Sequence, residues 1–323
     1  MRVGVVGLGL IGKKRIANLP ENCQLTFLCD VNEGLLKKIR EEYPKVPTTS
    51  NFVELVNSTN VDLVVIATTH ADLYPIAEAS LLAGKHVIVE KPGTTDPLLM
   101  QQLIGISSEN NLMLRIGYNH RFHPGLLKAK EIIDSGKHGK LLWIRGRYGH
   151  GGRVGYESEW RAKKSISGGG ELIDQGSHLI DLVRFLVGDV TLAFGETQTS
   201  FWKMEVEDNA YIALRPAIGG FAWLHASWTE WKNTFSLEIT LETAKIDISG
   251  LGGSYGVETL TYFKMKPEMG PPDSEVFKWE ASDESWNREM KDVLNSINGS
   301  TPIGATGHDA AEVLKIVKGI YNR

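Results

Sequence analysis

Two stretches of the chain carry side chains that can bind an alcohol and move its proton. Lys91 follows a short apolar run that ends in Glu90, and Pro92 comes directly after it. Further along, Asp174 and His178 stand four residues apart, so on an α-helix they share one face. A carboxylate can orient an imidazole and tune its pKa for general acid–base work, while an ammonium favours a developing alkoxide. These residues predict proton transfer at an alcohol carbon.

Each stretch also has an ordinary structural interpretation. By residue type alone, Lys91 is typical of a solvated loop. The second stretch is compatible with a capped helix in which Asp181 pairs with Arg184, but that interpretation leaves the glycines at 168–170 unexplained. We expect those glycines to leave space for a ligand beside the start of the helix. No metal is predicted, because no third ligand with a recognisable spacing accompanies Asp174 and His178.

A glycine-rich turn near the start of the chain predicts a dinucleotide site. It follows the apolar run 2–6 and opens a polar helix, so backbone amides and a helix N-terminus can approach a pyrophosphate. At the end of the next apolar run, Asp30 is placed to bind a ribose 2′-hydroxyl and to repel a 2′-phosphate. NAD is therefore expected rather than NADP, although a neighbouring basic residue such as Lys37 or Lys38 would weaken that preference. The predicted cofactor-binding residues of the turn are Gly7, Gly9, Leu10, Ile11 and Gly12.

The order of apolar runs predicts an α/β fold with two domains. Through about residue 118, strand-like runs alternate with helical segments, which is typical of a doubly wound parallel Rossmann sheet. Several strand-like runs between 191 and 265 then follow one another without helices, which favours an antiparallel sheet in an α+β domain. We expect an NAD-binding domain at 1–118 and a substrate-binding and oligomerisation domain at 119–323, whose last helix is free to pack on the first domain.

Composition excludes several classes of protein. The 323 residues are 42% hydrophobic and 23% charged, with no apolar stretch long enough to span a membrane, so disordered, collagenous and transmembrane chains are excluded. A net charge of −4 argues against nucleic acid and anionic membranes as partners. Cys23 and Cys29 are interpreted as thiols in a reducing compartment, and the chain enters a strand without a signal peptide. Together these features predict a cytoplasmic protein.

A glycine-rich loop at 149–161 is the predicted substrate-recognition segment. It mixes aromatic, basic and histidine side chains, and sugar recognition needs that mixture because aromatic faces pack on ring carbons while polar groups bind hydroxyls. Arg153 and Arg161 are also suited to clamp a phosphate or carboxylate, and a plain solvated loop is the alternative. The predicted substrate-binding residues here are Arg153, Tyr156, Trp160 and Arg161, joined by Tyr118, Asn119 and Arg121 from the segment between the two domains.

The strand-like run 219–230 is interpreted as structural. Trp223 and His225 alternate with Leu224 and Ala226, so the two sets of side chains point to opposite faces of a sheet. We expect one face to enter the domain core and the other to form a subunit interface.

Four motifs in order resemble the Gfo/Idh/MocA family of oxidoreductases, over nearly the whole chain. They are the glycine turn, the run Ala83-Gly-Lys-His-Val-Ile-Val-Glu90-Lys91-Pro92, the segment Asn119-His-Arg121-Phe, and Gly168-Gly-Gly-x-Leu-x-Asp174-x-x-x-His178. The resemblance implies a C-terminal domain built on a large, open, mostly antiparallel sheet. It also implies hydride transfer between a nicotinamide and a sugar-like alcohol, by homodimers or homotetramers that stack these sheets.

The resemblance assigns roles residue by residue. Lys91, Asp174 and His178 become the catalytic trio: His178 exchanges the hydroxyl proton, Asp174 orients it or binds substrate, and Lys91 holds the reacting oxygen. Glu90 and Lys91 join the cofactor-binding set at the strand end. Many relatives have Thr-Pro-Asn after the fourth strand, whereas this chain has Thr68-Thr-His70, so only Thr68 and His70 carry over as cofactor contacts there.

These observations predict an NAD-dependent dehydrogenase or reductase acting on a secondary alcohol or ketone of a sugar, sugar derivative or cyclic polyol. One alternative is a glycosidase that uses transient oxidation by a tightly held NAD. Another is a non-catalytic dinucleotide-binding regulator, which would have no need to keep Lys91, Asp174 and His178.

Overall fold

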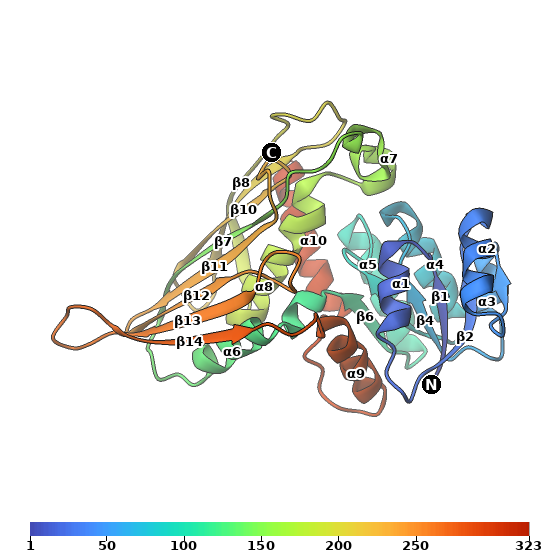
Figure 1. Ribbon diagram of the computed structural model, residues 1–323, viewed down its shortest axis with the longest axis horizontal. Coiled ribbons are helices and arrows are strands. Elements are labelled where there is room, and N and C mark those ends of the chain that lie inside the picture. Colours follow the sequence, from blue (N-terminus) through green and yellow to red (C-terminus); the bar gives the residue numbers. More distant parts are fainter. Residues whose placement is uncertain (323) are drawn as a thin grey trace. The chain divides into compact units, whose positions relative to one another are not determined.

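The computed structural model describes residues 1–322 and contains two compact units (Figure 1). Unit 1 consists of Met1–Asn119 and Trp286–Glu312. Unit 2 consists of His120–Ser285 and the chain from Val313 onward. The chain therefore leaves unit 1 after Asn119 and re-enters it at Trp286.

Unit 1 is built on a six-stranded parallel sheet with the strand order β3-β2-β1-β4-β5-β6. This order places β1 and β4 side by side at the centre, where the direction of winding reverses and where open α/β sheets bind their ligands. The strands are β1 (Arg2–Val6), β2 (Gln24–Cys29), β3 (Thr48–Thr49), β4 (Leu63–Ile66), β5 (His86–Glu90) and β6 (Leu114–Gly117).

Both faces of this sheet are covered by helices, because its central strands are apolar on both sides. Val3, Val5 and Val65 face a core shared with α1, α2 and α9. Gly4 lies on the other face, where a β-carbon would stand only 2.8 Å from Leu55 of α3. The helices are α1 (Leu10–Ala17), α2 (Glu33–Glu42), α3 (Phe52–Val56), α4 (His70–Leu82), α5 (Pro97–Glu109), α9 (Ser285–Ile297) and the first residues of α10 (Gly307–Tyr321).

Unit 2 is built on an eight-stranded sheet with the order β14-β13-β12-β11-β7-β10-β9-β8. All neighbours are antiparallel except β7 and β10, which run parallel. The predicted fold class, a doubly wound parallel sheet followed by a mostly antiparallel one, is confirmed. The strands are β7 (Leu141–Gly149), β8 (Val190–Gln198), β9 (Asn209–Pro216), β10 (Phe221–Ser227), β11 (Thr234–Leu241), β12 (Ala244–Ser249), β13 (Glu258–Lys264) and β14 (Asp273–Trp279).

One face of this sheet carries helices and the other is open. The helices α6 (Pro124–Asp134) and α8 (Ser177–Val187) lie against the covered face (Figure 1). In β10, Leu224 and Ala226 are fully buried, whereas Trp223 is 42% exposed, as the alternation predicts. A short helix α7 (Lys164–Ser167) precedes the segment that leads into α8.

Several elements differ from the sequence-based expectations. The edge strand β14 was missed, because its residues are polar, mostly exposed and preceded by two prolines, so no apolar alternation marks it. The short elements β3 and α3 were missed as well. Asp174 and His178 were expected on one α-helix, but Leu172–Gly176 form a π-helical turn that carries Asp174, and α8, which carries His178, begins at Ser177.

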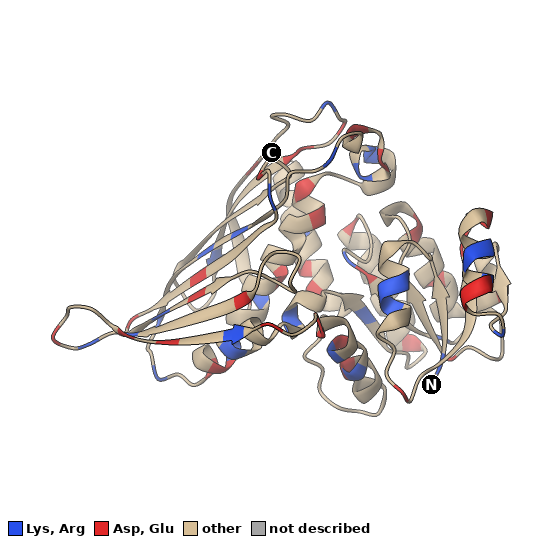
Figure 2. Cartoon of the chain, viewed as in Figure 1, with Lys and Arg blue, Asp and Glu red and all other residues tan. Residues whose placement is uncertain are grey.

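Both units carry Lys and Arg as well as Asp and Glu, as Figure 2 shows. Both cysteines are free thiols. Within the described part of the chain, every helix is too short or too polar to cross a lipid bilayer.

Candidate active site

The glycine turn of unit 1 has the geometry that a dinucleotide pyrophosphate needs. Gly7 adopts a left-handed conformation with φ of 90°, and a β-carbon at Gly12 would stand 1.8 Å from the Gly7 carbonyl oxygen. Gly9 caps α1 and has open space where its side chain would be. A pyrophosphate can therefore approach the backbone amides at the start of α1, so the residues present fit NAD.

Asp30 closes this turn at the end of β2. Its Oδ2 accepts a hydrogen bond from the backbone amide of Leu8 at 2.7 Å, and its Oδ1 accepts one from Asn32 at 2.8 Å. A carboxylate has further lone pairs, so Asp30 retains acceptor capacity for a ribose hydroxyl. The next residue, Val31, is 86% exposed and offers no positive charge for a 2′-phosphate.

The other predicted cofactor residues of unit 1 lie at the same ends of neighbouring strands. Thr68 follows β4, and His70 is buried as the first residue of α4. Glu90 is the last residue of β5 and Lys91 follows it, joined to Pro92 by a cis peptide bond. The Glu90 carboxylate is engaged by Arg15 of α1, whose Nε donates to Oε1 at 2.6 Å.

Gly169 and Gly170 allow close packing rather than leaving room for a ligand. A β-carbon on Gly169 would stand 2.0 Å from the hydroxyl of Tyr321, and one on Gly170 would stand 2.0 Å from the Glu207 carbonyl oxygen. The buried Glu207 carboxylate accepts hydrogen bonds from the amides of Gly170 at 3.0 Å and Leu172 at 3.1 Å. Burial raises the pKa of Glu207, and these hydrogen bonds oppose the rise. The expectation of ligand space beside these glycines is therefore wrong.

The π-helical turn carries Asp174, which is 8% exposed. Its Oδ2 accepts a hydrogen bond from Nε of Arg161 at 3.1 Å, and the Arg161 guanidinium stacks 4.4 Å from the ring of Trp160. Burial alone would lower the pKa of Arg161, but Asp174 and Tyr156 raise it overall. Arg161 and Trp160 were both predicted as site residues, and the structure joins them to Asp174. Single-turn π-helices are frequent at functional sites.

His178 lies in the first turn of α8 and is 6% exposed. Its ring lies against that of His120, with centroids 3.8 Å apart and planes inclined by 53°. Nε2 of His120 forms a hydrogen bond of 3.1 Å with the hydroxyl of Tyr148 in β7. His178 is therefore held by a second buried imidazole, which is itself held by a buried tyrosine.

Sequence reasoning did not assign Tyr148, Tyr255 or Gln175 to the site. Tyr148 and Tyr255 share a hydrogen bond, and Nε2 of Gln175 donates to the Tyr255 hydroxyl at 3.3 Å. Burial raises the pKa of both tyrosines, that of Tyr255 to about 12, so both hydroxyls stay protonated at neutral pH. One feature of the sequence could have pointed to Gln175, namely its position directly after Asp174. Tyr148 comes from the end of β7 and Tyr255 from the loop between β12 and β13, and no sequence spacing connects them.

Arg121 anchors α8 from inside unit 2. Its Nη2 and Nε donate to Asp181 at 2.6 and 2.9 Å, and both side chains are almost fully buried. The pairing of Asp181 with Arg184 is therefore wrong: Arg184 pairs with Asp189 at 3.1 Å instead. Tyr118 and Asn119, the other predicted residues of this segment, are buried at the end of unit 1.

The loop after β7 packs on its own small aromatic core. Tyr156 is buried against Trp228, with ring centroids 4.9 Å apart. Nδ1 of His150 accepts a hydrogen bond from the amide of Gly152 at 2.9 Å, so its imidazole carries its proton on Nε2. Burial lowers the pKa of His150, which agrees with this neutral form. Arg153 is exposed and pairs with Glu159 at 2.7 Å.

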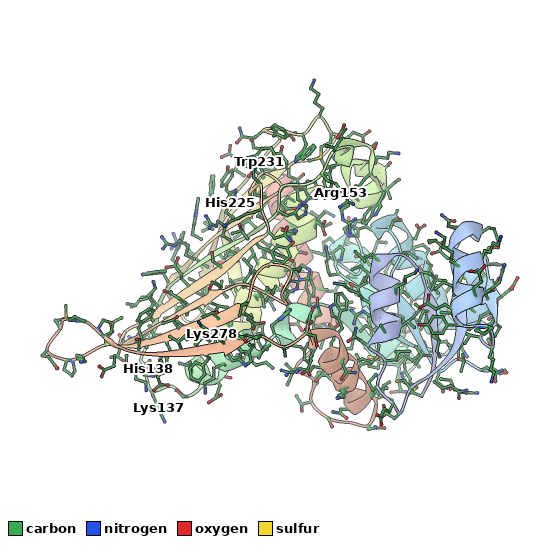
Figure 3. All side chains as sticks on the ribbon, viewed as in Figure 1. Lys137, His138, Arg153, His225, Trp231 and Lys278 are labelled. Atoms are coloured by element: carbon green, nitrogen blue, oxygen red, sulfur yellow. The ribbon has the colours of Figure 1, made fainter. Side chains whose placement is uncertain are left out.

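Figure 3 places Arg153 and Trp231 at the end of the sheet where β7 and β10 finish, and Lys137 and His138 at the opposite end. The loop after β7, which carries Arg153, also carries His150 and Tyr156.

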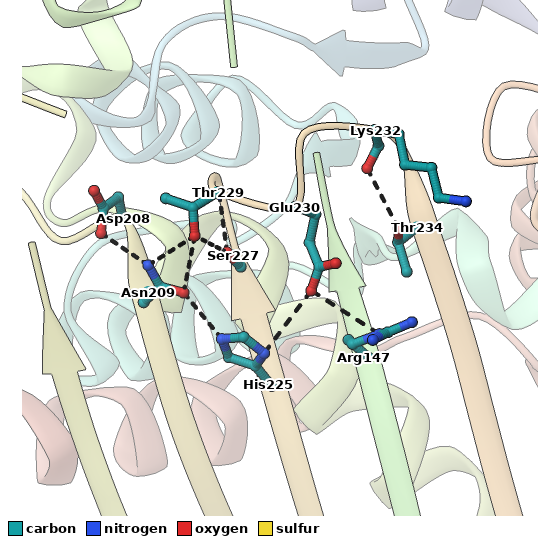
Figure 4. A network of polar contacts seen from close by, with 9 residues as sticks. All are labelled: Arg147, Asp208, Asn209, His225, Ser227, Thr229, Glu230, Lys232 and Thr234. Carbon is teal, nitrogen blue, oxygen red and sulfur yellow. Dashed lines mark hydrogen bonds and ion pairs between the residues drawn. The ribbon is translucent and has the colours of Figure 1, made fainter. Parts of the chain in front are cut away.

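A polar network fixes the backbone that supports this loop (Figure 4). His225 shares a hydrogen bond of 3.0 Å with Asn209, which also donates to Thr229 at 3.2 Å. Glu230 stands 4.0 Å from the other ring nitrogen of His225. The amide of Glu230 donates to the carbonyl of His150 at 3.2 Å, so the network reaches the loop through the main chain.

The predicted trio comes from both units. Lys91 belongs to unit 1, whereas Asp174 and His178 belong to unit 2. Within unit 2 the structure brings Asp174, Arg161 and Trp160 together in one cluster, and His178 and His120 in another.

Comparisons with known proteins agree with this architecture. Residues 1–118 match the model of the oxidoreductase family with an NAD-binding Rossmann fold, and residues 126–247 match the Gfo/Idh/MocA C-terminal domain. An inositol 2-dehydrogenase/D-chiro-inositol 3-dehydrogenase of Lactiplantibacillus plantarum is 26% identical over 320 residues, covering 95% of this chain and 86% of that enzyme. A levoglucosan dehydrogenase of Pseudarthrobacter phenanthrenivorans is 26% identical over 232 residues, covering 68% of this chain and 60% of that enzyme.

Among solved structures, a levoglucosan dehydrogenase in complex with NADH and L-sorbose superposes with a TM-score of 0.87. It is 21% identical, and the match covers 100% of this chain and 96% of that one, which shows a shared fold. Both domain models and full-length relatives thus agree with the glycine turn and the two sheets. The chain belongs to the Gfo/Idh/MocA family of oxidoreductases and carries its NAD-binding Rossmann domain.

Proposed function

We propose that the protein is an NAD-dependent dehydrogenase or reductase of a sugar, a sugar derivative or a cyclic polyol. The proposal is supported most directly by the arrangement of two consecutive helical turns in unit 2. On the first, Asp174 accepts a hydrogen bond from Arg161, and on the second, the ring of His178 packs against that of His120. A buried imidazole with a fixed orientation suits proton transfer with an alcohol, and a buried carboxylate from the preceding turn suits the binding of its hydroxyl groups.

The proposed roles follow from the chemistry of each side chain. NAD, when bound, supplies the hydride acceptor at its nicotinamide ring. His178 takes the hydroxyl proton of the alcohol or returns it to the ketone, and Asp174 binds substrate and orients the reacting group. Lys91 donates a hydrogen bond to the reacting oxygen and stabilises negative charge that develops on it.

The substrate class is supported by the side chains around the loop after β7. Trp160 carries Arg161 on its ring, and Arg153 is exposed on the same loop. Aromatic faces and hydrogen-bond donors together suit a ring with several hydroxyls. Two relatives named as inositol and levoglucosan dehydrogenases act on compounds of this kind, and we extend that class to this chain.

A preference for NAD over NADP is supported by Asp30. A carboxylate at the end of β2 accepts a hydrogen bond from a 2′-hydroxyl but repels a 2′-phosphate. Val31 provides no cation beside it.

We further propose that the open face of the eight-stranded sheet is the contact between subunits of a homodimer or homotetramer. Phe194 and Trp223 stack on this face with centroids 6.5 Å apart, and both are about 42% exposed. Exposed aromatic pairs are typical of interfaces. Light scattering with size-exclusion chromatography tests this: Trp223→Glu should produce monomers, and an unchanged mass would contradict the assignment.

The proposed function is tested by absorbance at 340 nm. Purified protein is mixed with NAD or NADP and a panel of myo-inositol, levoglucosan, free sugars, sugar phosphates, uronates and nucleotide sugars. NADH formation with one class, and much less NADPH, is the expected result. Saturable NAD binding without reduction by any alcohol, and without NADH oxidation by the matching ketones, would contradict the proposal.

A further inference from the structure

Arg15 is a buried cation that the proposed chemistry does not use. It lies in unit 1 on α1, and 1% of its surface is exposed. Removing a guanidinium from water is costly unless carboxylates and hydrogen bonds replace the water. The partners of Arg15 therefore indicate why a cation is kept at this position.

The first partner is Glu90, the last residue of β5. Nε and Nη2 of Arg15 both stand 2.6 Å from Oε1 of Glu90. Lys91 is the next residue, so the guanidinium holds the chain one residue before the proposed catalytic ammonium. The Nε hydrogen bond is charge-assisted, and the short approach of Nη2 to the same oxygen keeps the whole guanidinium against this carboxylate.

The second set of partners comes from α9, more than 270 residues later in the chain. Nη1 of Arg15 donates to Oε2 of Glu289 at 2.5 Å, and the guanidinium carbon lies 4.6 Å from the centre of the Trp286 ring. Glu289 is 2% exposed. The guanidinium is thus clamped between β5 and α9.

The end of β6 is shaped to admit this group. A β-carbon on Gly117 would stand 2.5 Å from Nη2 of Arg15 and 3.1 Å from the Glu90 carboxyl group. Any side chain larger than hydrogen at 117 would displace the ion pair. The guanidinium is therefore enclosed by the ends of two strands and by α9.

The helix that carries Arg15 is the one that opens at the glycine turn. Arg15 stands three residues after Gly12, one turn into α1. Through it, the helix that receives the pyrophosphate is tied to the strand end that carries Lys91. The amide-based phosphate site and the ammonium then have fixed relative positions within unit 1.

We propose that Arg15 is a positioning residue that sets the place of Lys91 relative to the phosphate-binding helix α1, with Glu90 as its direct contact and Glu289 as its support. The proposal rests on the catalytic role proposed for Lys91. Arg15 touches neither substrate nor the reacting atoms, and acts through Glu90.

The kinetic test compares Arg15→Lys and Glu289→Ala with wild type and with Arg2→Lys. Lysine keeps the charge at 15 but lacks the planar guanidinium that donates to Glu90 through Nε and to Glu289 through Nη1. Arg2 is a matched control, since it pairs with Asp62 through Nε at 3.0 Å in the same unit but is exposed. The assays are kcat and KM with the alcohol that gives most NADH, the Kd for NAD from fluorescence quenching, and the melting temperature.

Displacement of Lys91 should lower kcat by about tenfold or more in Arg15→Lys, while the Kd for NAD stays within about threefold. Glu289→Ala should lower kcat by a smaller factor, and Arg2→Lys should leave it unchanged. If Arg15→Lys is insoluble, Glu289→Ala carries the same test. A lower melting temperature with kcat unchanged in the soluble variants would overturn the proposal, because it would leave Arg15 a structural role only.

A second readout needs no substrate. NAD-saturated protein is labelled with acetic anhydride, and the rate at Lys91 is compared with that at Lys85 by peptide mass spectrometry. The rate at Lys91 should change by more than about threefold in Arg15→Lys and Glu289→Ala, because ammonium reactivity depends on its surroundings. Lys85 should label at the wild-type rate. A changed labelling rate at Lys91, in a protein that shows no turnover, would support the positioning role while contradicting the proposed function. An unchanged labelling rate at Lys91 would overturn the positioning role itself.

Discussion

The imidazole rings of His120 and His178 lie with their centroids 3.8 Å apart, and both are more than nine-tenths buried. His120 is tied through Nε2 to the hydroxyl of Tyr148. Because His120 packs against the ring of His178 and is itself held by a hydrogen bond on its far side, it limits the rotamers that His178 can adopt. The orientation of His178 is therefore set by a residue 58 positions earlier in the chain.

His120→Ala should lower kcat because the cavity beside His178 lets its ring rotate away from the reacting proton. We expect a fall of about tenfold or more, with the Kd for NAD unchanged. His120→Phe keeps a ring at this position and should recover part of the loss. Steady-state rates at saturating NAD measure both variants. Equal kcat in His120→Ala and wild type would show that His178 does not depend on this contact.

The cofactor preference should reverse when the acidic residue at the end of β2 is removed. The double variant Asp30→Ser, Val31→Arg replaces the repelling carboxylate and adds a cation for a 2′-phosphate. The ratio of kcat/KM for NAD to that for NADP should fall by about tenfold or more. Lys45→Ala serves as the control, since that exposed lysine after α2 should leave the ratio unchanged. An unaltered ratio in the double variant would remove Asp30 from ribose recognition.

The buried pair of Arg121 and Asp181 should dominate the stability of α8. Asp181→Asn leaves the guanidinium without its counter-charge, and breaking a buried pair costs about 3–5 kcal/mol. The exposed pair of Arg145 and Glu238 has the same bidentate geometry, with Nε donating at 2.8 Å. Glu238→Gln should cost about 1 kcal/mol or less. Urea unfolding measures both, and equal losses would contradict the importance given to burial.

Glu289 should make the free energy of unfolding depend on pH. Burial raises its pKa in the fold to about 7 from 4.5, Arg15 opposes the rise, and the neighbouring Glu90 and Asp292 add to it. Between these values the unfolded chain releases the proton while the folded chain keeps it, so stability falls as pH rises through the window.

Glu289→Gln removes this titration. Across that window, wild type should lose roughly 1.4 kcal/mol per pH unit relative to the variant, and the difference should level off above about pH 7. Urea unfolding of both proteins at a series of pH values measures it. A difference that stays constant from acid to neutral pH would show that Glu289 is ionised throughout.

Much of the architecture could be predicted because its signals are local. The turn at 7–12, Asp30 and the apolar runs of unit 1 occur in the order that a βα alternation requires, and the structure places them accordingly. The alternation of Trp223 with Leu224 likewise predicted the two faces of β10.

The unpredicted features depend on contacts between distant segments. Gly169 accommodates Tyr321 and Gly170 accommodates Glu207, which nothing in the local sequence indicates. The π-helical turn has no sequence signature, and the partner of Asp181 is Arg121 because the fold buries the two together while Arg184 lies near Asp189. From the sequence, Arg15 is one of several polar residues in the helix after the glycine turn. Only its ion pair with Glu289 of α9 shows why it is buried.

We propose that Lys91 and His178 act on the alcohol and not on the binding of NAD. Lys91→Ala and His178→Ala are compared with wild type for NADH formation at 340 nm with the alcohol that responds best, and for the Kd of NAD. We expect each variant to lose at least about 100-fold in kcat while the Kd changes by less than about threefold. Wild-type turnover in either variant, or loss of turnover explained by loss of NAD binding, would contradict it.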